Sequence, residues 1–402
     1  MLTFTILSIS LLTVMAGAAM APALGVISEH FSDISGIMVQ LIVSMPALFI
    51  IITNFFFPAL CRLMRTRTLA LTGLVLYIAA GAGAYFAGNI WTLLALRALL
   101  GVSVGMIMPL STGLLPYYFP PEEQARLMGL AAFMSQVGGV IATFLSGFLC
   151  TLGWNSSFLV YLLGVVALVL VVAFLPNDRL ETGNKTLDSS PDSYESECGV
   201  TKARKNPGHP AASLMRFAPS VIGMYLVMLL FFIFTTNFAI IAKEHGNIDI
   251  NVITLIMVWL DVVAAVTGLL FGRMMRLLPR YMKYLSPLGF IAGYLCFSAG
   301  TSLWLSVAGS TLVGLANGIG VPYLNTIASI KGGKNAATTV MPLISAAMFL
   351  GQFTSPLIVS PLSGFLNGVT APYKIGVIFS LIFLVQAYCS RRYQAISLPA
   401  QH

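Results

Sequence analysis

Apolar residues run along this chain in stretches of about 20, separated by short breaks rich in polar residues, glycine and proline. A helix rises about 1.5 Å per residue, so about 20 apolar residues cross the hydrocarbon core of a bilayer. The first stretch lacks a basic segment before it and is too long for a cleavable signal, so we interpret it as a retained helix. The pattern predicts twelve membrane-spanning helices, at residues 4–27, 36–61, 68–88, 91–115, 128–150, 156–175, 217–241, 251–271, 284–301, 303–326, 337–360 and 373–389.

One polar segment divides the predicted helices into six and six. Residues 177–216 contain six acidic and six basic residues among Ser, Pro, Gly and Asn. Such a composition cannot bury a core, which is typical of a flexible linker. The chain is therefore predicted to consist of an N-terminal six-helix bundle (1–176), a cytoplasmic linker (177–216), and a C-terminal six-helix bundle with a short cytoplasmic tail (217–402).

The two halves carry traces of each other. Three positions of the fourth predicted helix recur 213 residues later in the tenth, with Gly101, Gly105 and Pro109 matching Gly314, Gly318 and Pro322. The run Leu-Ser-Gly-Phe-Leu at 145–149 also recurs at 362–366. Six-helix halves repeated in parallel are the architecture of transporters that rock two bundles about a central site.

Composition and charge support a membrane protein and fix a predicted orientation. Charged residues make up 8% of the chain and the hydrophobic set 58%, whereas a soluble domain has about 25% charged residues. With a cytoplasmic N-terminus, 18 of the 21 Lys and Arg residues fall on the cytoplasmic side and two outside. This distribution follows the positive-inside rule, so the net charge of +8 needs no nucleic-acid partner. We expect a multi-pass protein of the cell inner membrane with both termini cytoplasmic.

Motifs of soluble enzymes find no support from their context. Gly101-Val-Ser-Val-Gly105 matches a hydrolase elbow around Ser103, but it lies in a continuous apolar helix with no His nearby. Glycines four residues apart more often allow close helix packing in membranes. The five cysteines show no metal-binding or disulfide spacing, and no complete phosphate-binding loop is present. The sequence predicts neither an enzyme nor a cofactor or metal site.

Two ionisable residues within predicted helices are the main candidates for function. Each costs about 2.5–3.5 kcal/mol at mid-membrane on insertion scales and needs a partner or water. Asp261 lies near the middle of the eighth predicted helix, on a face of small and polar residues. We interpret it as a proton carrier; the alternative is a structural acid bonded to backbone or to Arg97. Arg97 could modulate the proton, pack helices, or bind an anionic substrate through its five donors.

The segment Leu96-Arg97-Ala-Leu-Leu-Gly101-Val-Ser-Val-Gly105 resembles the fourth-helix signature of the major facilitator superfamily, closest to its drug:proton antiporter branch. The resemblance covers residues 4–392. It implies twelve helices in two pseudo-symmetric bundles, proton handling at Arg97, and a gating loop at Arg62, Arg65 and Arg67, with Arg276 as the counterpart in the second half. It also implies a substrate path lined by helices one, four, seven and ten, with candidate residues Thr13, Met15, Met108, Thr235, Asn237, Asn317, Tyr323 and Asn325. Asn54, Gln136 and Gln352 could instead join the halves.

The resulting hypothesis is a monomeric secondary transporter that exports small amphipathic compounds by alternating access, driven by protons that move inward. A second hypothesis is an uptake or exchange carrier for small organic anions, with Arg97 as the anchor. A receptor or scaffold would require neither the repeat nor Asp261. The predicted partners are a small-molecule substrate, protons and the lipid bilayer.

Overall fold

The computed structural model describes residues 2–176, 217–244, 248–279, 281–300, 302–332, 340–366 and 368–390. Within these ranges the protein is all-helical, as the hydropathy pattern predicts. The first group comprises α1 (Leu2–Ala18), α2 (Leu24–His30), α3 (Gly36–Leu63), α4 (Thr66–Gly83), η1 (Ala84–Phe86), α5 (Ile90–Tyr118), α6 (Pro121–Cys150), η2 (Trp154–Leu163) and α7 (Gly164–Phe174). The second comprises α9 (Ala218–Glu244), α10 (Ile250–Leu277), α11 (Met282–Ala299), α12 (Leu303–Gly332), α13 (Met341–Ser363) and α14 (Ala371–Cys389).

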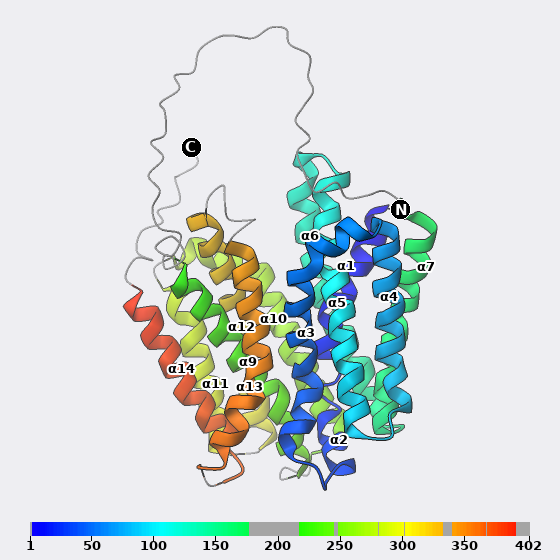
Figure 1. Cartoon of the computed structure of the whole chain (residues 1–402). Coiled ribbons are helices and arrows are strands. Elements are labelled where there is room, and N and C mark those ends of the chain that lie inside the picture. The colour runs from blue at the N-terminus through cyan, green and yellow to red at the C-terminus, as the bar shows by residue number, and fades with distance from the viewer. Residues whose placement is uncertain are drawn as a thin grey trace, which may run out of the picture.

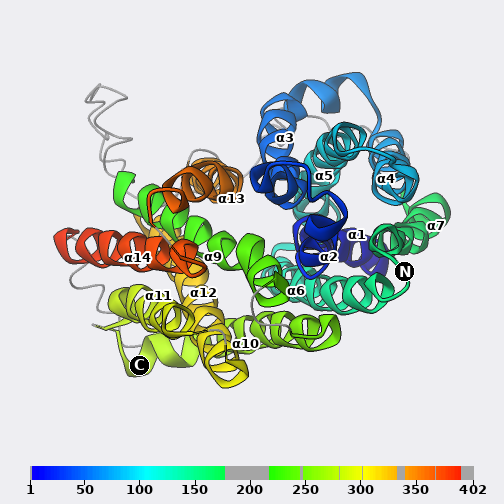
Figure 2. The ribbon, with the colours of Figure 1, turned by 90° about the horizontal axis from the view of Figure 1, so that it is seen from below.

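The helices lie roughly along one direction in two side-by-side groups, α1–α7 and α9–α14 (Figures 1 and 2). The first residues of α1 and the last of α14 lie toward the same end, and α2 lies at the opposite end (Figure 1). Ten helical segments of the described chain are long and apolar enough to span a membrane, and α1 is a shorter apolar helix. The protein is a multi-pass membrane protein with the twelve-helix arrangement. The predicted linker at 177–216 and the tail beyond 390 lie outside the described residues, so the domain boundaries stay a prediction.

The predicted first helix at 4–27 is wrong as a continuous element. It ends at Ala18, turns through residues 19–23 and resumes as α2. Pro22 stands in this turn and has no backbone N–H to continue the helical hydrogen bonds. The hydropathy pattern does not reveal this break, because the residues before and after it are apolar and mostly buried.

Other helix ends differ from the prediction by one or two turns. Helix α10 continues to Leu277 rather than 271, and α12 continues to Gly332 rather than 326. The apolar runs stop at the first polar residue, whereas the backbone hydrogen bonds continue through the basic last turn of α10, which holds Arg276. The sixth predicted helix begins as the 3₁₀ helix η2 after Gly153, whose φ of +145° suits only glycine.

The sequence repeat reappears as a repeat of packing. An added Cβ on Gly101 would lie 2.4 Å from the Pro46 carbonyl oxygen of α3, and one on Gly314 would lie 2.7 Å from the Leu260 carbonyl oxygen of α10. Both glycines therefore let the backbones of paired helices touch. A second equivalent pair supports the match, because the Ser103 hydroxyl donates to the Gly73 carbonyl while the Ser286 hydroxyl donates to the Ala316 carbonyl.

Candidate functional site

Asp261 lies where helices α6 and α10 bring the two groups together. The Thr143 hydroxyl of α6 donates to Asp261 Oδ2 at 2.9 Å, and Asp261 is half-buried. One turn further along α6, an added Cβ on Gly147 would lie 2.1 Å from Thr254 Oγ1 of α10. The missing side chain at Gly147 thus lets α6 approach α10 closely enough for Thr143 to reach the carboxyl group.

No cation neutralises Asp261 within the described chain. The single ion pair there joins Lys243 Nζ to Glu29 Oε1 at 3.7 Å. In this conformation the described residues therefore contain no ion pair between Asp261 and Arg97. A membrane carboxyl group that holds a hydroxyl partner and no counter-ion can exchange a proton without first breaking a salt bridge.

Arg97 is fully buried inside the first group of helices. Its Nη1 donates to the Tyr161 hydroxyl at 2.8 Å, and that hydroxyl donates to the Ala16 carbonyl of α1 at 3.2 Å. The guanidinium carbon lies 4.9 Å from the ring centre of Phe158 and 4.8 Å from that of Tyr161. Such contacts supply about 0.5–2 kcal/mol each. The rings of η2 thus offset part of the free-energy cost of burying the Arg97 charge, which in other proteins a carboxylate offsets.

Two donors of Arg97 remain unused. Its Nε and Nη2 atoms are buried and have no hydrogen-bond partner among the described residues. Leaving charged donors unpaired in a protein interior is costly, so such groups are usually satisfied by water, an ion or a ligand. Arg97 therefore retains the capacity to bind an anion or a water molecule.

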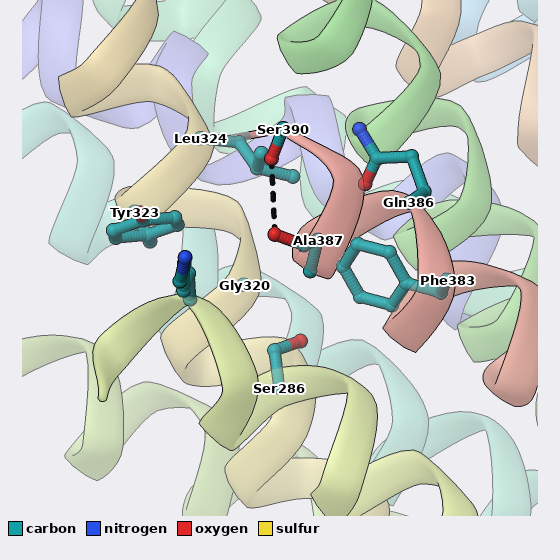
Figure 3. A pocket seen from close by; sticks show the side chains of 9 residues that line it. Ser286, Gly320, Tyr323, Leu324, Phe383, Gln386, Ala387 and Ser390 are labelled. Atoms are coloured by element: carbon teal, nitrogen blue, oxygen red, sulfur yellow. Dashed lines mark hydrogen bonds between the residues drawn. The ribbon is translucent and has the colours of Figure 1, made fainter. Parts of the chain in front are cut away.

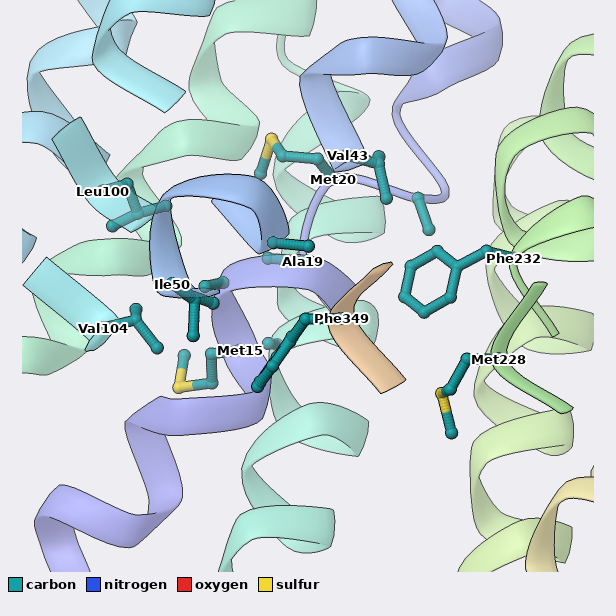
Figure 4. Close-up of a cluster of buried hydrophobic side chains, with 14 of the residues drawn as sticks. Met15, Ala19, Met20, Val43, Ile50, Leu100, Val104, Met228, Phe232 and Phe349 are labelled. Atoms are coloured by element: carbon teal, nitrogen blue, oxygen red, sulfur yellow. The ribbon is translucent and has the colours of Figure 1, made fainter. Parts of the chain in front are cut away.

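The predicted path residues of α1 and α9 are mostly occupied by protein contacts. Thr13 shares a hydrogen bond with Ser135 of α6 at 3.2 Å, and Thr235 donates to its own helix at Phe231. Met15 is fully buried in an apolar cluster beside Ile50 and Phe349 (Figure 4). Met15 therefore packs in the apolar contact between α1, α3 and α13.

Asn237 of α9 joins the two groups of helices. Gln40 Nε2 of α3 donates to Asn237 Oδ1 at 2.9 Å, and Asn237 Nδ2 donates to the Ile233 carbonyl. Both side chains of this pair are buried. Asn237 is therefore engaged by protein in this conformation.

The predicted residues of α12 have different surroundings. Tyr323 lines a hollow between α11, α12 and α14 together with Ser286 and Phe383 (Figure 3). The hollow, counted with the open space at its mouth, measures about 320 Å³. Asn317 has a buried Oδ1 with no hydrogen-bond partner in the part of the chain that the structure describes. Asn325 of α12 and the α5 candidate Met108 are half-buried. Asn317 is thus the α12 residue with the clearest unused capacity for a ligand.

The basic residues predicted to form gates lie at helix ends. Arg62 and Arg276 occupy the last turns of α3 and α10, and Arg65 precedes α4. These three are exposed, whereas Arg67 is half-buried and donates to the Val172 carbonyl of α7. Arg67 thus ties α4 to α7.

Residues that the sequence reading missed include Thr143 and Gln40. Both are the polar partners of predicted residues, Asp261 and Asn237 respectively. The sequence shows that Thr143 and Gln40 are polar residues within apolar helices. It does not show their partners, because these depend on how α6 packs against α10 and how α3 packs against α9. Gln352, expected to join the halves, donates to the Val43 carbonyl of α3 at 3.4 Å.

Comparisons with known proteins place the chain in a family. The model described as "Major Facilitator Superfamily" matches residues 6–356. A putative inorganic phosphate cotransporter of Drosophila melanogaster is 31% identical over 139 residues, which cover 33% of this chain and 26% of that protein. The riboflavin transporter RibZ of Clostridioides difficile is 24% identical over 152 residues, which cover 37% of this chain and 33% of that protein. The matches span about a quarter to a third of these relatives.

A solved structure agrees over almost the whole chain. It is a bacterial homologue of the human lysosomal transporter Spinster in an inward-facing, unoccupied conformation, with a TM-score of 0.73 at 15% identity. The alignment covers 97% of this chain and 96% of that one. At this identity the likeness concerns the fold.

Proposed function

Because this chain belongs to the major facilitator superfamily, and is therefore a secondary transporter rather than an enzyme, we propose that it couples small-molecule movement to proton movement at Asp261. The observation that carries the proposal is the position of Asp261 at the α6–α10 contact, with Thr143 as its side-chain partner and no cation of the described residues paired with it. Alternating access changes such contacts between halves. Asp261 would thus exchange its proton as α6 and α10 part and close.

The proposed direction is export of small amphipathic compounds by a monomer in the inner membrane, with protons entering. The support for export is the resemblance of the segment around Arg97 to the antiporter branch. In the proposed mechanism no salt bridge has to break. Instead, the protonated and the ionised side chain of Asp261 differ in how strongly they hold the contact with Thr143. Substrate would occupy the interface between the halves in the alternate protonation state.

A liposome assay of the purified protein tests this proposal. A pH difference of about one unit stores about 1.4 kcal/mol per proton, enough to sustain about a tenfold substrate gradient. Asp261→Asn is expected to fold and to exchange substrate passively, but not to build a gradient. Asp249→Asn is the matched control, since Asp249 caps the exposed start of the same helix. Gradient-driven transport by Asp261→Asn at the wild-type level would contradict proton coupling at this residue.

A second candidate is uptake or exchange of small organic anions with Arg97 as the anchor. It is favoured by the unpartnered Nε and Nη2 of Arg97 and by the phosphate cotransporter among the similar proteins. The same liposomes, loaded in turn with cationic, neutral and anionic compounds, separate the two candidates. Flux restricted to anions and abolished in Arg97→Gln would replace the export proposal.

A further inference from the structure

The hydroxyl group of Thr143 has two acceptors for its single proton. Its oxygen lies 2.9 Å from Asp261 Oδ2 and 3.0 Å from the Gly139 carbonyl oxygen of its own helix. An ionised Asp261 accepts the proton of Thr143, whereas a protonated Asp261 can donate to the Thr143 oxygen while Thr143 turns its proton to Gly139. The contact is therefore available to both forms of Asp261, and it is stronger with the ionised form.

No charged side chain of the described residues lies against Asp261. Its side-chain partner is Thr143 of α6. Helix α10 itself carries its charged residues toward its two ends, with Asp249 before its first residue and Arg273 and Arg276 near its last. A proton therefore has to reach Asp261 through water rather than from a neighbouring acid or base.

Two buried serine hydroxyls lie closer to the end of α6 at Cys150, which the predicted topology places outside. Ser146 of α6 and Ser157 of η2 are both fully buried, and neither Oγ has a hydrogen-bond partner among the described residues. A helical serine often donates to the carbonyl four residues before it, as Ser380 does to Gly376. Buried hydroxyls without a protein partner are usually satisfied by water. These two positions are thus suited to hold water molecules.

The two serines lie on a line from Thr143 to the end of α6. Ser146 follows Thr143 by three residues and Cys150 follows Ser146 by four, so these side chains are neighbours on the helix surface. Ser157 approaches Cys150 without the geometry of a hydrogen bond. The partly exposed Lys243 of α9 is near enough to act on the Cys150 thiol electrostatically. The line covers about 10 Å along α6, at about 1.5 Å per residue, and ends near an exposed group.

The direct contact between α6 and α10 leaves no such line. Figure 2 shows the two helices side by side where the groups meet. Toward the Cys150 end, an added Cβ on Gly147 would lie 2.1 Å from Thr254 Oγ1, and the Thr254 hydroxyl donates to its own helix. Toward the other end, the face of α10 that carries Asp261 continues with Ala264 and Gly268, which have no hydroxyl. Among the described side chains, the polar line toward Asp261 therefore passes Ser146.

We propose that water held by the Ser146 and Ser157 hydroxyls forms a proton route along α6 from the outer face to Asp261. A proton from the outer medium moves inward by successive transfers, in which each water forms one O–H bond and breaks another. The last transfer forms an O–H bond on the Asp261 carboxylate and leaves that group neutral. Loading thus needs no separation of α6 from α10, and release follows once the helices part. The inference rests on the proton coupling proposed above.

The rate at which Asp261 gains a proton tests the route without any substrate. The purified protein in detergent is moved rapidly from high to low pH while the infrared band of the protonated Asp261 carboxyl group is followed. Asp261→Asn identifies this band by its loss. Ser146→Val removes the hydroxyl, and Ser146→Thr keeps it in a side chain of nearly the same shape. We expect Ser146→Val to gain the proton about tenfold more slowly, which corresponds to about 1.4 kcal/mol in the barrier.

The Ser146→Thr variant should gain the proton at the wild-type rate. The pH at which half of Asp261 is protonated should be the same in both Ser146 variants, because the route changes the rate and not the equilibrium. A structural effect of Ser146→Val on Asp261 would shift that pH instead. A wild-type rate in Ser146→Val would overturn the proposal.

Ser157→Ala tests the outer part of the route on a different element, and it decides the question if the Ser146 variants do not fold. We expect it to slow protonation of Asp261 about threefold, less than Ser146→Val, because alanine leaves room for water. Ser380→Ala is the matched control, since Ser380 is equally buried but bonds to its own helix. Equal rates in these two variants would overturn the proposal.

The outcomes separate this inference from the proposed function. If Asp261→Asn builds a substrate gradient normally, proton coupling at Asp261 fails, whatever rates the serine variants show. If Asp261→Asn loses gradient-driven transport while Ser146→Val gains its proton at the wild-type rate, the route fails and the coupling stands.

Discussion

Asp261 and Arg97 represent two ways of keeping an ionisable side chain inside a membrane protein. Asp261 stands at the contact between halves and accepts from Thr143. Arg97 is buried within one half, where the Phe158 and Tyr161 rings and one hydroxyl surround it. A group at a contact that opens can change its partners during transport, whereas a group enclosed in one half keeps them. This difference makes Asp261 the better candidate for coupling.

Thr143→Val should weaken the α6–α10 contact while keeping the side-chain shape. The lost hydrogen bond accounts for about 0.5–2 kcal/mol, the range for such bonds in proteins and membranes. The expected result is a lower melting temperature in detergent. Thr72→Val is the control, because the Thr72 hydroxyl is exposed and donates to its own helix at Thr68. Equal melting temperatures for the two variants would show that the Thr143–Asp261 bond contributes nothing measurable.

Arg97→Met tests whether Arg97 serves stability or function. Replacing a buried ion pair by apolar side chains of similar volume is often neutral or stabilising by about 1–4 kcal/mol, and we expect the same direction for a buried charge with unsatisfied donors. Because Nε and Nη2 have no partner within the described ranges, we expect an unchanged or higher melting temperature together with reduced flux. A marked loss of stability would assign Arg97 to helix packing.

At the scale of helices, glycine positions decide which elements can pair. Gly101 of α5 touches α3 and Gly314 of α12 touches α10, so each half packs its fourth helix onto its second. Gly147 does the same between halves, where α6 meets α10. In a bilayer the lipid tails are as apolar as the side chains, so close backbone approach and hydrogen bonds replace the hydrophobic effect as the source of specific pairing.

Gly101→Ala should destabilise the α3–α5 pair. Its Cβ would lie 2.4 Å from the Pro46 carbonyl oxygen, so the backbones must separate, at a cost of about 1–3 kcal/mol. Gly113→Ala on the same helix meets no atom within 4 Å and should be neutral or slightly stabilising through helix propensity. Thermal unfolding in detergent measures both. Equal melting temperatures for the two variants would mean that the close approach of α3 at Gly101 contributes nothing measurable.

At the scale of the molecule, the arrangement predicts which ends face the cytoplasm. In the predicted topology 18 of the 21 Lys and Arg residues fall on one side of the membrane, so the α4 start should be cytoplasmic and the α11–α12 connection outside. In a chain without native cysteines, Ser302→Cys should react with an impermeant maleimide on intact cells, whereas Leu278→Cys should react only after lysis. The reverse pattern would invert the topology. The natural Cys198, in the predicted linker, lies outside the described residues.

The sequence by itself determined what depends on local pattern. Twelve helices follow from apolar length, because every backbone group in lipid must be satisfied within its own helix. The repeat and the family follow from glycines and the segment around Arg97. Asp261 and Arg97 stood out because charge within an apolar run is costly wherever the helix lies.

Only the tertiary structure decided which side chains meet. Asp261 could not be assigned to Thr143 or separated from Arg97 from sequence, because partners depend on how helices rotate and cross. The candidate Asn237 contacts Gln40, and the candidate Tyr323 lines the hollow between α11, α12 and α14. The break before α2 was hidden as well, since an apolar run continues across it. Apolarity specifies that a segment lies in the membrane, while small differences in packing and hydrogen bonding specify its neighbours.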